Sequence, residues 1–325
     1  MHASPLIFLL MLVGVGAALC AVATAVMAWS LTHPPRMTDG KAAWVLRRLS
    51  PADVGFPFEE TTFEVRDEHG KPLKLVAWWI PNSAARGRCA LLIHGYADAK
   101  VGAIAWAPVW HSLGFNLLVC DLRAHGQSEG SVCTAGCFER HDLLQIIHDL
   151  RASRPEDARQ VVLFGISLGA AVAAAVACEG VDIAAVVMES PYADFPRAAM
   201  AHMDHLGLPG RALQRLAIDL AQWLTHADYD ALSPIRLIPL IPSPLLVIES
   251  GNDPFLSSED RVALSNALNS RSSTLGRAEI WKVAGVEHSM ALSAAPGAYR
   301  QHLSDFLNKA SIAIEPPSAH PVSTA

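Results

Sequence analysis

The fold of this chain is most clearly indicated by the stretch Val161-Val162-Leu163-Phe164-Gly165-Ile166-Ser167-Leu168-Gly169-Ala170-Ala171. Four apolar residues run into a Gly-x-Ser-x-Gly motif, and small helix-forming residues follow it. This order predicts a buried strand, a sharp turn that carries Ser167, and a helix that begins at the turn. Gly165 and Gly169 have no side chains that could collide across so tight a bend.

The start of that helix gives the motif a chemical meaning. Its first backbone N–H groups would face the hydroxyl of Ser167, and the N–H of Leu168 would donate to negative charge that develops there. The alternative is a glycine-flanked turn with a solvated serine, because such a motif also occurs by chance. The serine therefore needs partners elsewhere in the chain before it indicates a reaction.

Short apolar stretches alternate with helical stretches around this motif. The predicted strands cover residues 89–93, 115–120, 160–164, 183–188, 245–248 and 278–283. Their continuous apolar runs, with helical segments between them, predict a mainly parallel sheet covered by helices on both faces. Residues 61–66 and 73–80, joined by a polar turn, predict an antiparallel hairpin that leads into the sheet.

Polar residues follow several of these strands, at the edge where ligands bind in α/β sheets. His94-Gly95-Tyr96 follows the strand at 89–93, and a polar, glycine-containing loop at 121–130 follows the next strand. Asp253 lies in the loop after 245–248, and His288 lies in the loop after 278–283. We therefore expect a hydroxyl, a carboxylate and an imidazole to meet at one rim of the sheet.

Together these motifs resemble the α/β-hydrolase superfamily, over about residues 60–310. Within it the chain is similar to the branch of monoglyceride lipases, serine aminopeptidases and membrane-anchored bacterial hydrolases. The resemblance implies an α/β-hydrolase fold with a helical cap insertion. It implies Ser167 as the nucleophile, His288 as the general base and Asp253 as the orienting acid. The N–H groups of Tyr96 and Leu168 are the implied oxyanion donors.

Other residues compete for these roles or support them. Glu249 and Asp121 are the alternatives to Asp253, but Glu249 falls inside a strand and Asp121 is placed as a loop organiser. We expect support of the oxyanion loop, without reaction, from His94, Arg123 and His125. His202 and His205 are expected to be solvated cap residues, because no further ligands stand at a spacing that suits a metal.

Composition and charge exclude several classes of function. The chain has 325 residues and a net charge of −6 with no basic stripe, so we expect no nucleic-acid partner. The six cysteines include no C-x-x-C pair, which argues against a zinc site or a redox motif. We therefore expect no metal and no cofactor.

An apolar stretch without charge occupies residues 5–31. It is long enough to span a bilayer and longer than the apolar region of a typical signal peptide. We expect a single-pass N-terminal membrane anchor; a signal peptide cleaved at a site such as Ala21-x-Ala23 is the alternative. Basic residues soon after the stretch favour a cytoplasmic enzyme domain, but they lie so close to a folded domain that the side of the membrane stays open.

The predicted organisation has six parts. These are an anchor at 1–35, a juxtamembrane linker at 36–59, a first core segment at 60–190, a helical cap at 191–242, a second core segment at 243–310 and a disordered tail at 311–325. Helices are expected in the cap at 195–205 and 210–226. The apolar stripe of the second cap helix would either pack on the domain or line an acyl pocket.

These expectations combine into one leading hypothesis and two alternatives. The leading hypothesis is a serine hydrolase that cleaves a small-molecule ester, a thioester or a lipid-derived substrate through an acyl-enzyme. The first alternative is a peptidase or amidase that uses the same three residues. The second is a catalytically silent hydrolase fold that serves as a membrane-tethered binding module.

Overall fold

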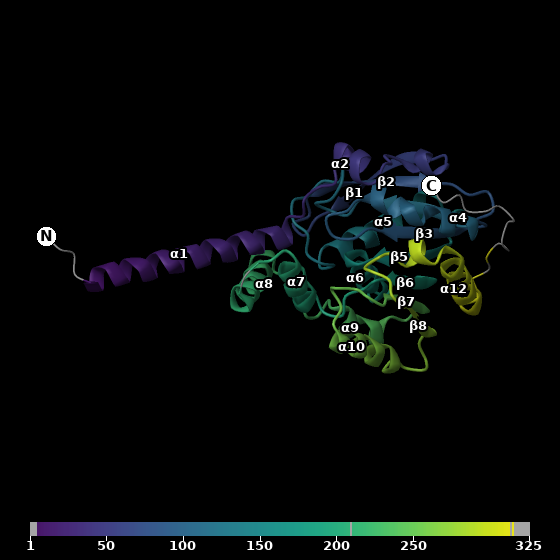
Figure 1. The fold of residues 1–325 in the computed structure, drawn as a ribbon. Helices are drawn as coiled ribbons and strands as arrows, with labels where there is room; N and C mark the ends of the chain where they lie inside the picture. The colour runs from purple at the N-terminus through teal and green to yellow at the C-terminus, as the bar shows by residue number, and fades with distance from the viewer. Residues whose placement is uncertain (1–4, 209, 313, 315–325) are drawn as a thin grey trace.

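The computed structural model describes residues 5–208, 210–312 and 314. A twisted sheet runs through the body of the molecule (Figure 1), with its eight described strands in the order β1-β2-β4-β3-β5-β6-β7-β8. β1 pairs antiparallel with β2, and β2 with β4; all other neighbours are parallel. The strands are β1 (Glu59–Arg66), β2 (Pro72–Ile80), β3 (Arg88–Ile93), β4 (Asn116–Cys120), β5 (Gln160–Ile166), β6 (Ala185–Glu189), β7 (Leu245–Ser250) and β8 (Ala278–Val283).

The burial of these strands explains their sequences. β3 and β4 are buried at every residue, because helices cover both faces of the sheet, and they read as continuous apolar runs. Side chains in β5 alternate between two cores: Val161 and Leu163 contribute to one core, and Val162 and Phe164 to the other. The mainly parallel architecture and the antiparallel hairpin at its edge are therefore confirmed.

Helices form the two outer layers of the body. α5 (Glu139–Ser153) and α6 (Leu168–Ala177) share a core with one face of the sheet, and α4 (Ala107–Ser112) and α12 (Pro296–Lys309) share a core with the other. The shorter helical elements are α2 (Asp39–Val45), η1 (Pro51–Val54), α3 (Lys100–Ala103), η2 (Ile104–Trp106), α9 (Pro234–Leu237), η3 (Ile238–Leu240) and α11 (Ala291–Ala294). α10 (Ser258–Asn269) follows β7.

A helical insertion separates β6 from β7, as expected. It contains α7 (Phe195–His205) and α8 (Arg211–Thr225). Asp194 caps α7 by accepting the backbone N–H of Arg197, and this cap fixes where the helix begins. Both helices lie at the end of the body from which the N-terminal helix leaves (Figure 1).

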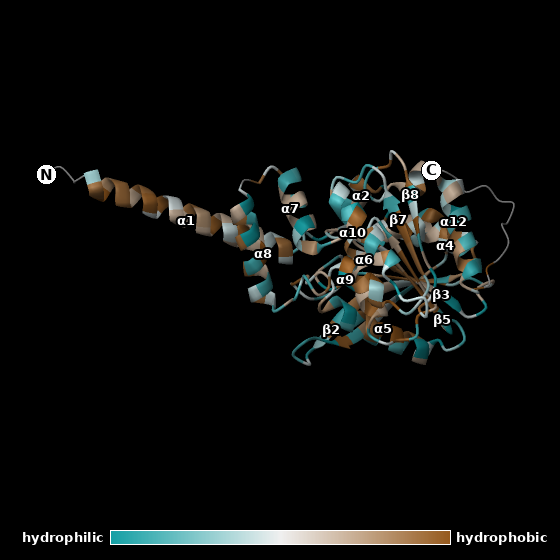
Figure 2. Ribbon diagram, turned by 90° about the horizontal axis from the view of Figure 1, so that it is seen from below, coloured by the Kyte–Doolittle hydropathy of each residue, from teal (hydrophilic) through white to brown (hydrophobic). Residues whose placement is uncertain are grey.

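The N-terminal helix α1 (Pro5–Thr32) projects from the body and is apolar along its length (Figure 2). It is long and apolar enough to cross a membrane. Its last turns belong to the body, since Met27, Ala28 and Thr32 are buried and the Thr32 carbonyl accepts the backbone N–H of Cys133 at 2.7 Å. Most of the expected tail at 311–325 lies outside the described residues.

Candidate active site

Ser167 occupies the turn between β5 and α6 in a strained backbone conformation, with φ 54° and ψ −115°. A non-glycine residue rarely adopts a positive φ, so the surrounding packing must hold it there. Two glycines allow that packing. A Cβ atom at Gly165 would lie 2.1 Å from the carbonyl oxygen of Gly169, and one at Gly169 would lie 2.2 Å from that of Ile93. The elbow can therefore form only with glycine at both positions.

Replacing Gly169 by alanine is expected to disrupt this elbow. The new methyl group meets backbone atoms, which cannot rotate away, so we expect the free energy of unfolding to fall by about 3 kcal/mol or more. The matched control is Gly297→Ala in α12, where a Cβ meets nothing within 4 Å. The control should leave stability unchanged or raise it by up to about 1 kcal/mol. Urea unfolding followed by circular dichroism compares the two; equal stability would mean that the elbow is not tightly packed.

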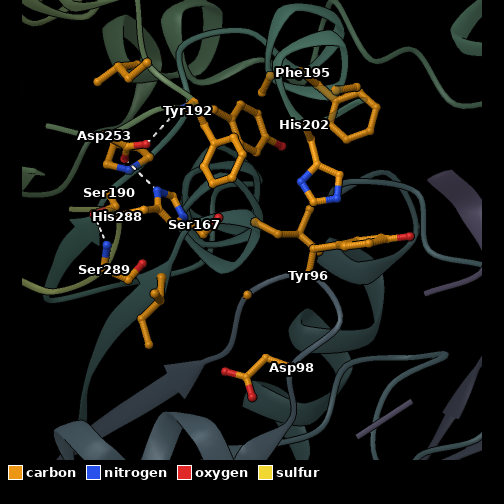
Figure 3. A pocket seen from close by; sticks show the side chains of 18 of the residues that line it. Tyr96, Asp98, Ser167, Ser190, Tyr192, Phe195, His202, Asp253, His288 and Ser289 are labelled. Atoms are coloured by element: carbon orange, nitrogen blue, oxygen red, sulfur yellow. Dashed lines mark hydrogen bonds and ion pairs between the residues drawn. The ribbon is translucent and has the colours of Figure 1, made fainter. Parts of the chain in front are cut away.

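His288 and Asp253 form a hydrogen-bonded pair on the loops that follow β8 and β7. Nδ1 of His288 lies 2.6 Å from Oδ2 of Asp253. A carboxylate can only accept, so the imidazole donates from Nδ1 and its Nε2 carries the free lone pair. In Figure 3 that second ring nitrogen faces Ser167. The Asp253 side chain is only 2% exposed, and its other oxygen accepts the backbone N–H of Phe255 at 2.9 Å.

Ser167, His288 and Asp253 line a single cavity of about 310 Å³ (Figure 3). The structure thus brings together the three side chains that follow β5, β7 and β8. Most of the remaining wall is apolar or aromatic and is formed by Leu31, Trp106, Ile166, Pro191, Tyr192, Phe195, Ala198, Ala199, Phe255 and Leu256. Such a wall suits an apolar substrate group held next to a few polar atoms.

The two competing acids are engaged elsewhere. Glu249 is buried in β7 and forms an ion pair with Arg261 at 2.6 Å. Asp121 is buried at the end of β4 and pairs with Nζ of Lys100 at 2.7 Å. Asp121 also accepts backbone N–H groups from the loops on both sides of it, as expected of a loop organiser. Neither carboxylate lines the cavity in the part of the chain that the structure describes.

The loop after β3 approaches Ser167 from the other side. A Cβ atom at Gly95 would lie 3.5 Å from that of Ser167. Residues 95–98 form a turn in which the backbone N–H of Asp98 donates to the Gly95 carbonyl at 3.4 Å. The N–H of Tyr96, the second residue of the turn, does not take part in this hydrogen bond. Among the hydrogen bonds of the described residues, the N–H groups of Tyr96 and Leu168 have no acceptor. Both are free to donate to a substrate oxygen.

His94 supports this loop through both ring nitrogens. Nδ1 lies 2.7 Å from the Gly95 carbonyl, and Nε2 accepts the backbone N–H of Leu122 at 3.0 Å. Burial, and then the neighbouring His125, lower the pKa of His94 to about 3, so the ring stays neutral. Arg123 pairs with Asp142 through two hydrogen bonds at 2.6 and 2.7 Å. These contacts hold the loops in place. Among the described residues, the side chains of His94, Arg123 and His125 are not part of the cavity wall.

The position of His202, a residue of the cap, differs from the prediction. His202 was expected to be solvated, but it is half-buried and lines the cavity. The centre of its ring lies 5.6 Å from that of Phe255 and 6.4 Å from that of Tyr96. Figure 3 shows His202 beside Tyr96. Burial and the nearby His205 and His288 lower its pKa. No local sequence pattern distinguishes the inward face of α7 from its outward face at this position.

A buried carboxyl group lies behind the pocket. Glu189 ends β6, is fully buried, and accepts from Nε1 of Trp106 at 2.7 Å and from the hydroxyl of Tyr299 at 2.5 Å. Burial raises the pKa of Glu189 to about 7, although both hydrogen bonds act in the opposite direction. The next residue, Ser190, accepts the backbone N–H of Ser289 at 3.0 Å. The end of β6 therefore supports the loop that carries His288.

Glu189 should make stability depend on pH. Because burial raises its pKa, its contribution to stability is present below the unfolded value near 4.5 and is lost as the pH rises through about 7. In Glu189→Gln this loss disappears, while the amide oxygen can still accept both hydrogen bonds. The Tm of the variant relative to the unmodified protein should therefore rise between about pH 5 and about pH 8.5. A parallel pH dependence of the two Tm values would contradict a raised pKa.

Comparisons with known proteins extend over most of the body. The family described as "Alpha/beta hydrolase family" matches residues 90–301. Uncharacterized protein YqkD of Bacillus subtilis is 24% identical over 258 residues, which cover 77% of this chain and 80% of that protein. Uncharacterized protein Rv2307c of Mycobacterium tuberculosis is 29% identical over 182 residues, and the match spans 56% of this chain and 58% of that protein.

Solved structures share the fold. Esterase Pf2001 of Pyrococcus furiosus superposes with a TM-score of 0.65 at 22% identity, covering 85% of this chain and 98% of the esterase. The acylaminoacyl peptidase of Pyrococcus horikoshii superposes with a TM-score of 0.55 at 15% identity, covering 87% of this chain and 45% of the peptidase. Proteins named as an esterase and as a peptidase thus share this architecture, and the architecture alone does not select the substrate.

Proposed function

Because the chain belongs to the alpha/beta hydrolase family, we propose that it is a serine hydrolase that cleaves an ester or a thioester through an acyl-enzyme. The observation that carries this proposal is the meeting of Ser167 with the His288–Asp253 pair in one cavity. A serine hydroxyl is a weak nucleophile at neutral pH, so it needs a base at hand. An imidazole held by a buried carboxylate is such a base.

The proposed reaction proceeds in two halves. Nε2 of His288 takes the proton of Ser167 as Oγ attacks the substrate carbonyl carbon, and the N–H groups of Tyr96 and Leu168 stabilise the resulting oxyanion. The protonated imidazole then gives its proton to the departing alcohol or thiol, which leaves an acyl group on Ser167. Water then attacks the acyl carbon and loses a proton to His288; as the acyl–Oγ bond breaks, the imidazole gives that proton to Ser167 Oγ, the acid leaves, and the enzyme returns to its starting state.

The cavity wall favours an apolar acyl group, in keeping with a lipid-derived substrate. Aromatic and aliphatic side chains surround Ser167, and the volume of about 310 Å³ suits a short to medium chain.

One observation favours the alternative peptidase or amidase. Asp98 also lines the cavity, with one carboxylate oxygen buried and without a hydrogen-bond partner among the described residues. Such an oxygen could pair with the ammonium group of an aminoacyl substrate.

A fluorophosphonate probe and a substrate panel test these assignments. Fluorophosphonates phosphonylate an activated serine, so the folded protein should be labelled, and labelling should be lost in Ser167→Ala. A panel of p-nitrophenyl esters of increasing chain length should be cleaved faster than aminoacyl amides; the reverse order would favour a peptidase. Folded protein that neither reacts with the probe nor cleaves the panel would favour a silent binding module.

We also propose that α1 anchors this hydrolase in a membrane. The helix runs without a break through Ala21 and Ala23 into the part that packs on the body. Leu31, near its end, belongs to the cavity wall. Fractionation of cells that express the full chain should find it in the membrane pellet, resistant to carbonate extraction; a shortened, freely soluble chain would favour a cleaved signal peptide.

A further inference from the structure

Helix α8 leaves an apolar stripe open to solvent. Leu216, Trp223 and Leu224 are 54%, 70% and 58% exposed. At 3.6 residues per turn these three side chains lie on the same side of the helix; we call them the outer stripe. The opposite side packs into the protein through Gln214, Ala217, Ile218, Ala221 and Thr225. The outer stripe is not part of the cavity wall in the described chain, so neither the core nor the site accounts for it.

Charged residues lie beside the outer stripe. Arg211, Arg215 and Asp219 are exposed on the flank of α8 between its packed side and the stripe. A helix with one apolar face, a neighbouring charged flank and an exposed tryptophan has the composition of a helix that lies in a membrane interface.

The geometry of α1 determines where a membrane would meet the body. Residues 5–22 are exposed throughout, and the burial of α1 begins immediately after them. At a rise of 1.5 Å per residue these 18 residues span about 27 Å, close to the hydrocarbon thickness of about 30 Å. If this segment fills the bilayer, the membrane surface lies at the point where α1 enters the protein.

Hydrogen bonds fix α1 to the body at that point and so set the orientation of the body relative to the helix. The hydroxyl of Tyr96 donates to the carbonyl of Ser30, and the backbone N–H of Cys133 donates to that of Thr32. The Arg36 guanidinium, just beyond the helix, donates to the carbonyl groups of His125, Gly126, Ser128 and Gly130.

α8 lies across α1 at this same level. The two helices contact each other, and Met27 and Ala28 share a hydrophobic cluster with Ala217 and Ala221. Figures 1 and 2 show α8 running crosswise to α1 where α1 joins the body. A helix that lies crosswise to a membrane-spanning helix runs along the membrane surface.

We propose that the outer stripe of α8 inserts into the interface of the bilayer that α1 crosses, with the lipid acyl chains as its partner. The proposal rests on the proposed anchoring role of α1. Two attachments then hold the body against the membrane in one orientation. Leu31 of α1, together with Phe195, Ala198 and His202 of α7, forms cavity wall on the side of α8. The two helices that contact α8 therefore also line the cavity that contains Ser167, and a membrane-dissolved ester is the class of substrate that this arrangement favours.

Spin labels on the full chain in phosphatidylcholine–phosphatidylglycerol vesicles test the proposal. All labelled variants carry Cys20→Ala, which removes the exposed native cysteine of α1. Val13→Cys places one label on an exposed position near the middle of segment 5–22. Separate labels are placed by Leu216→Cys and Trp223→Cys on the stripe and by Arg215→Cys on the charged flank as the matched control. Cys20→Ala alone gives the background from the other cysteines. Each label is assayed for collisions with oxygen, which concentrates in lipid, and with a water-soluble nickel chelate.

We expect the oxygen-to-nickel collision ratio to be high at position 13 and several-fold higher at 216 and 223 than at 215. If the label at 13 is in lipid while the ratios at 216 and 223 equal the ratio at 215, the anchor stands and the α8 interface is wrong. If the label at 13 is exposed to water, α1 does not span the membrane, and both proposals are overturned.

Discussion

Ser167→Ala is expected to lower kcat for a p-nitrophenyl ester by about 10⁶-fold while the fold is retained. Alanine removes only the hydroxyl, and Ser167 Oγ is the one group that the proposed mechanism cannot replace. The strained φ of 54° is as accessible to alanine as to serine, so no large change in stability is expected. Stopped assays at high enzyme concentration, together with circular dichroism, measure both quantities.

The control for this variant is a second serine in the same cavity. Ser289 also lines the pocket and has a positive φ, 57°, and its hydroxyl has no hydrogen-bond partner among the described residues. Ser289→Ala should therefore remain reactive toward a fluorophosphonate. If Ser167→Ala retained most of its turnover while Ser289→Ala lost it, the nucleophile would be Ser289 and the assignment of Ser167 would be wrong.

Asp253→Asn is expected to lower kcat by about 10⁴-fold. Asparagine keeps the size of the side chain, but its amide can present an N–H₂ group to Nδ1 of His288, which favours the tautomer that cannot accept the serine proton. The buried position of Asp253 and the 2.6 Å contact make this loss larger than that expected of an exposed pair. Steady-state rates of the variant and the unmodified protein, measured under the same conditions, provide the test.

Glu249→Gln distinguishes Asp253, the proposed orienting acid, from Glu249, its nearest competitor in the sequence. Glu249 is buried and paired with Arg261, so the variant should lose stability, because Arg261 is left without its counter-charge. Its turnover should change far less than that of Asp253→Asn. A loss of turnover in Glu249→Gln equal to that in Asp253→Asn would transfer the role of the acid to Glu249.

Local patterns predicted the sheet because strand burial and side-chain period are properties of short segments. β5 and the elbow that follows it could be predicted from eleven consecutive residues, since two glycines and a serine between an apolar run and a helix have few other structural solutions. The sequence left Asp253, Glu249 and Asp121 as competing acids, because all three lie at or near strand ends. Their partners, Lys100 and Arg261 among them, become visible only in three dimensions.

The cavity wall could not be predicted in the same way. Leu31 ends an apolar helix that composition alone would place wholly in a membrane, yet it contributes to the pocket. His202 turns inward because α7 packs between the core and α8, and tertiary packing of this kind leaves no local signal. Glu189 is a charged residue at the end of an apolar strand, where only the positions of Trp106 and Tyr299 explain its burial.

The most direct test of the proposed mechanism is the mass of the protein during turnover of an activated ester. After acid quenching, a fraction of the protein should be heavier by one acyl group. The group should lie on the peptide that contains Ser167 and be absent from Ser167→Ala. Slowing deacylation with a bulky acyl group should increase that fraction. Turnover with an acyl group on another residue, or with no acylated protein under conditions that trap such intermediates, would contradict an acyl-enzyme on Ser167.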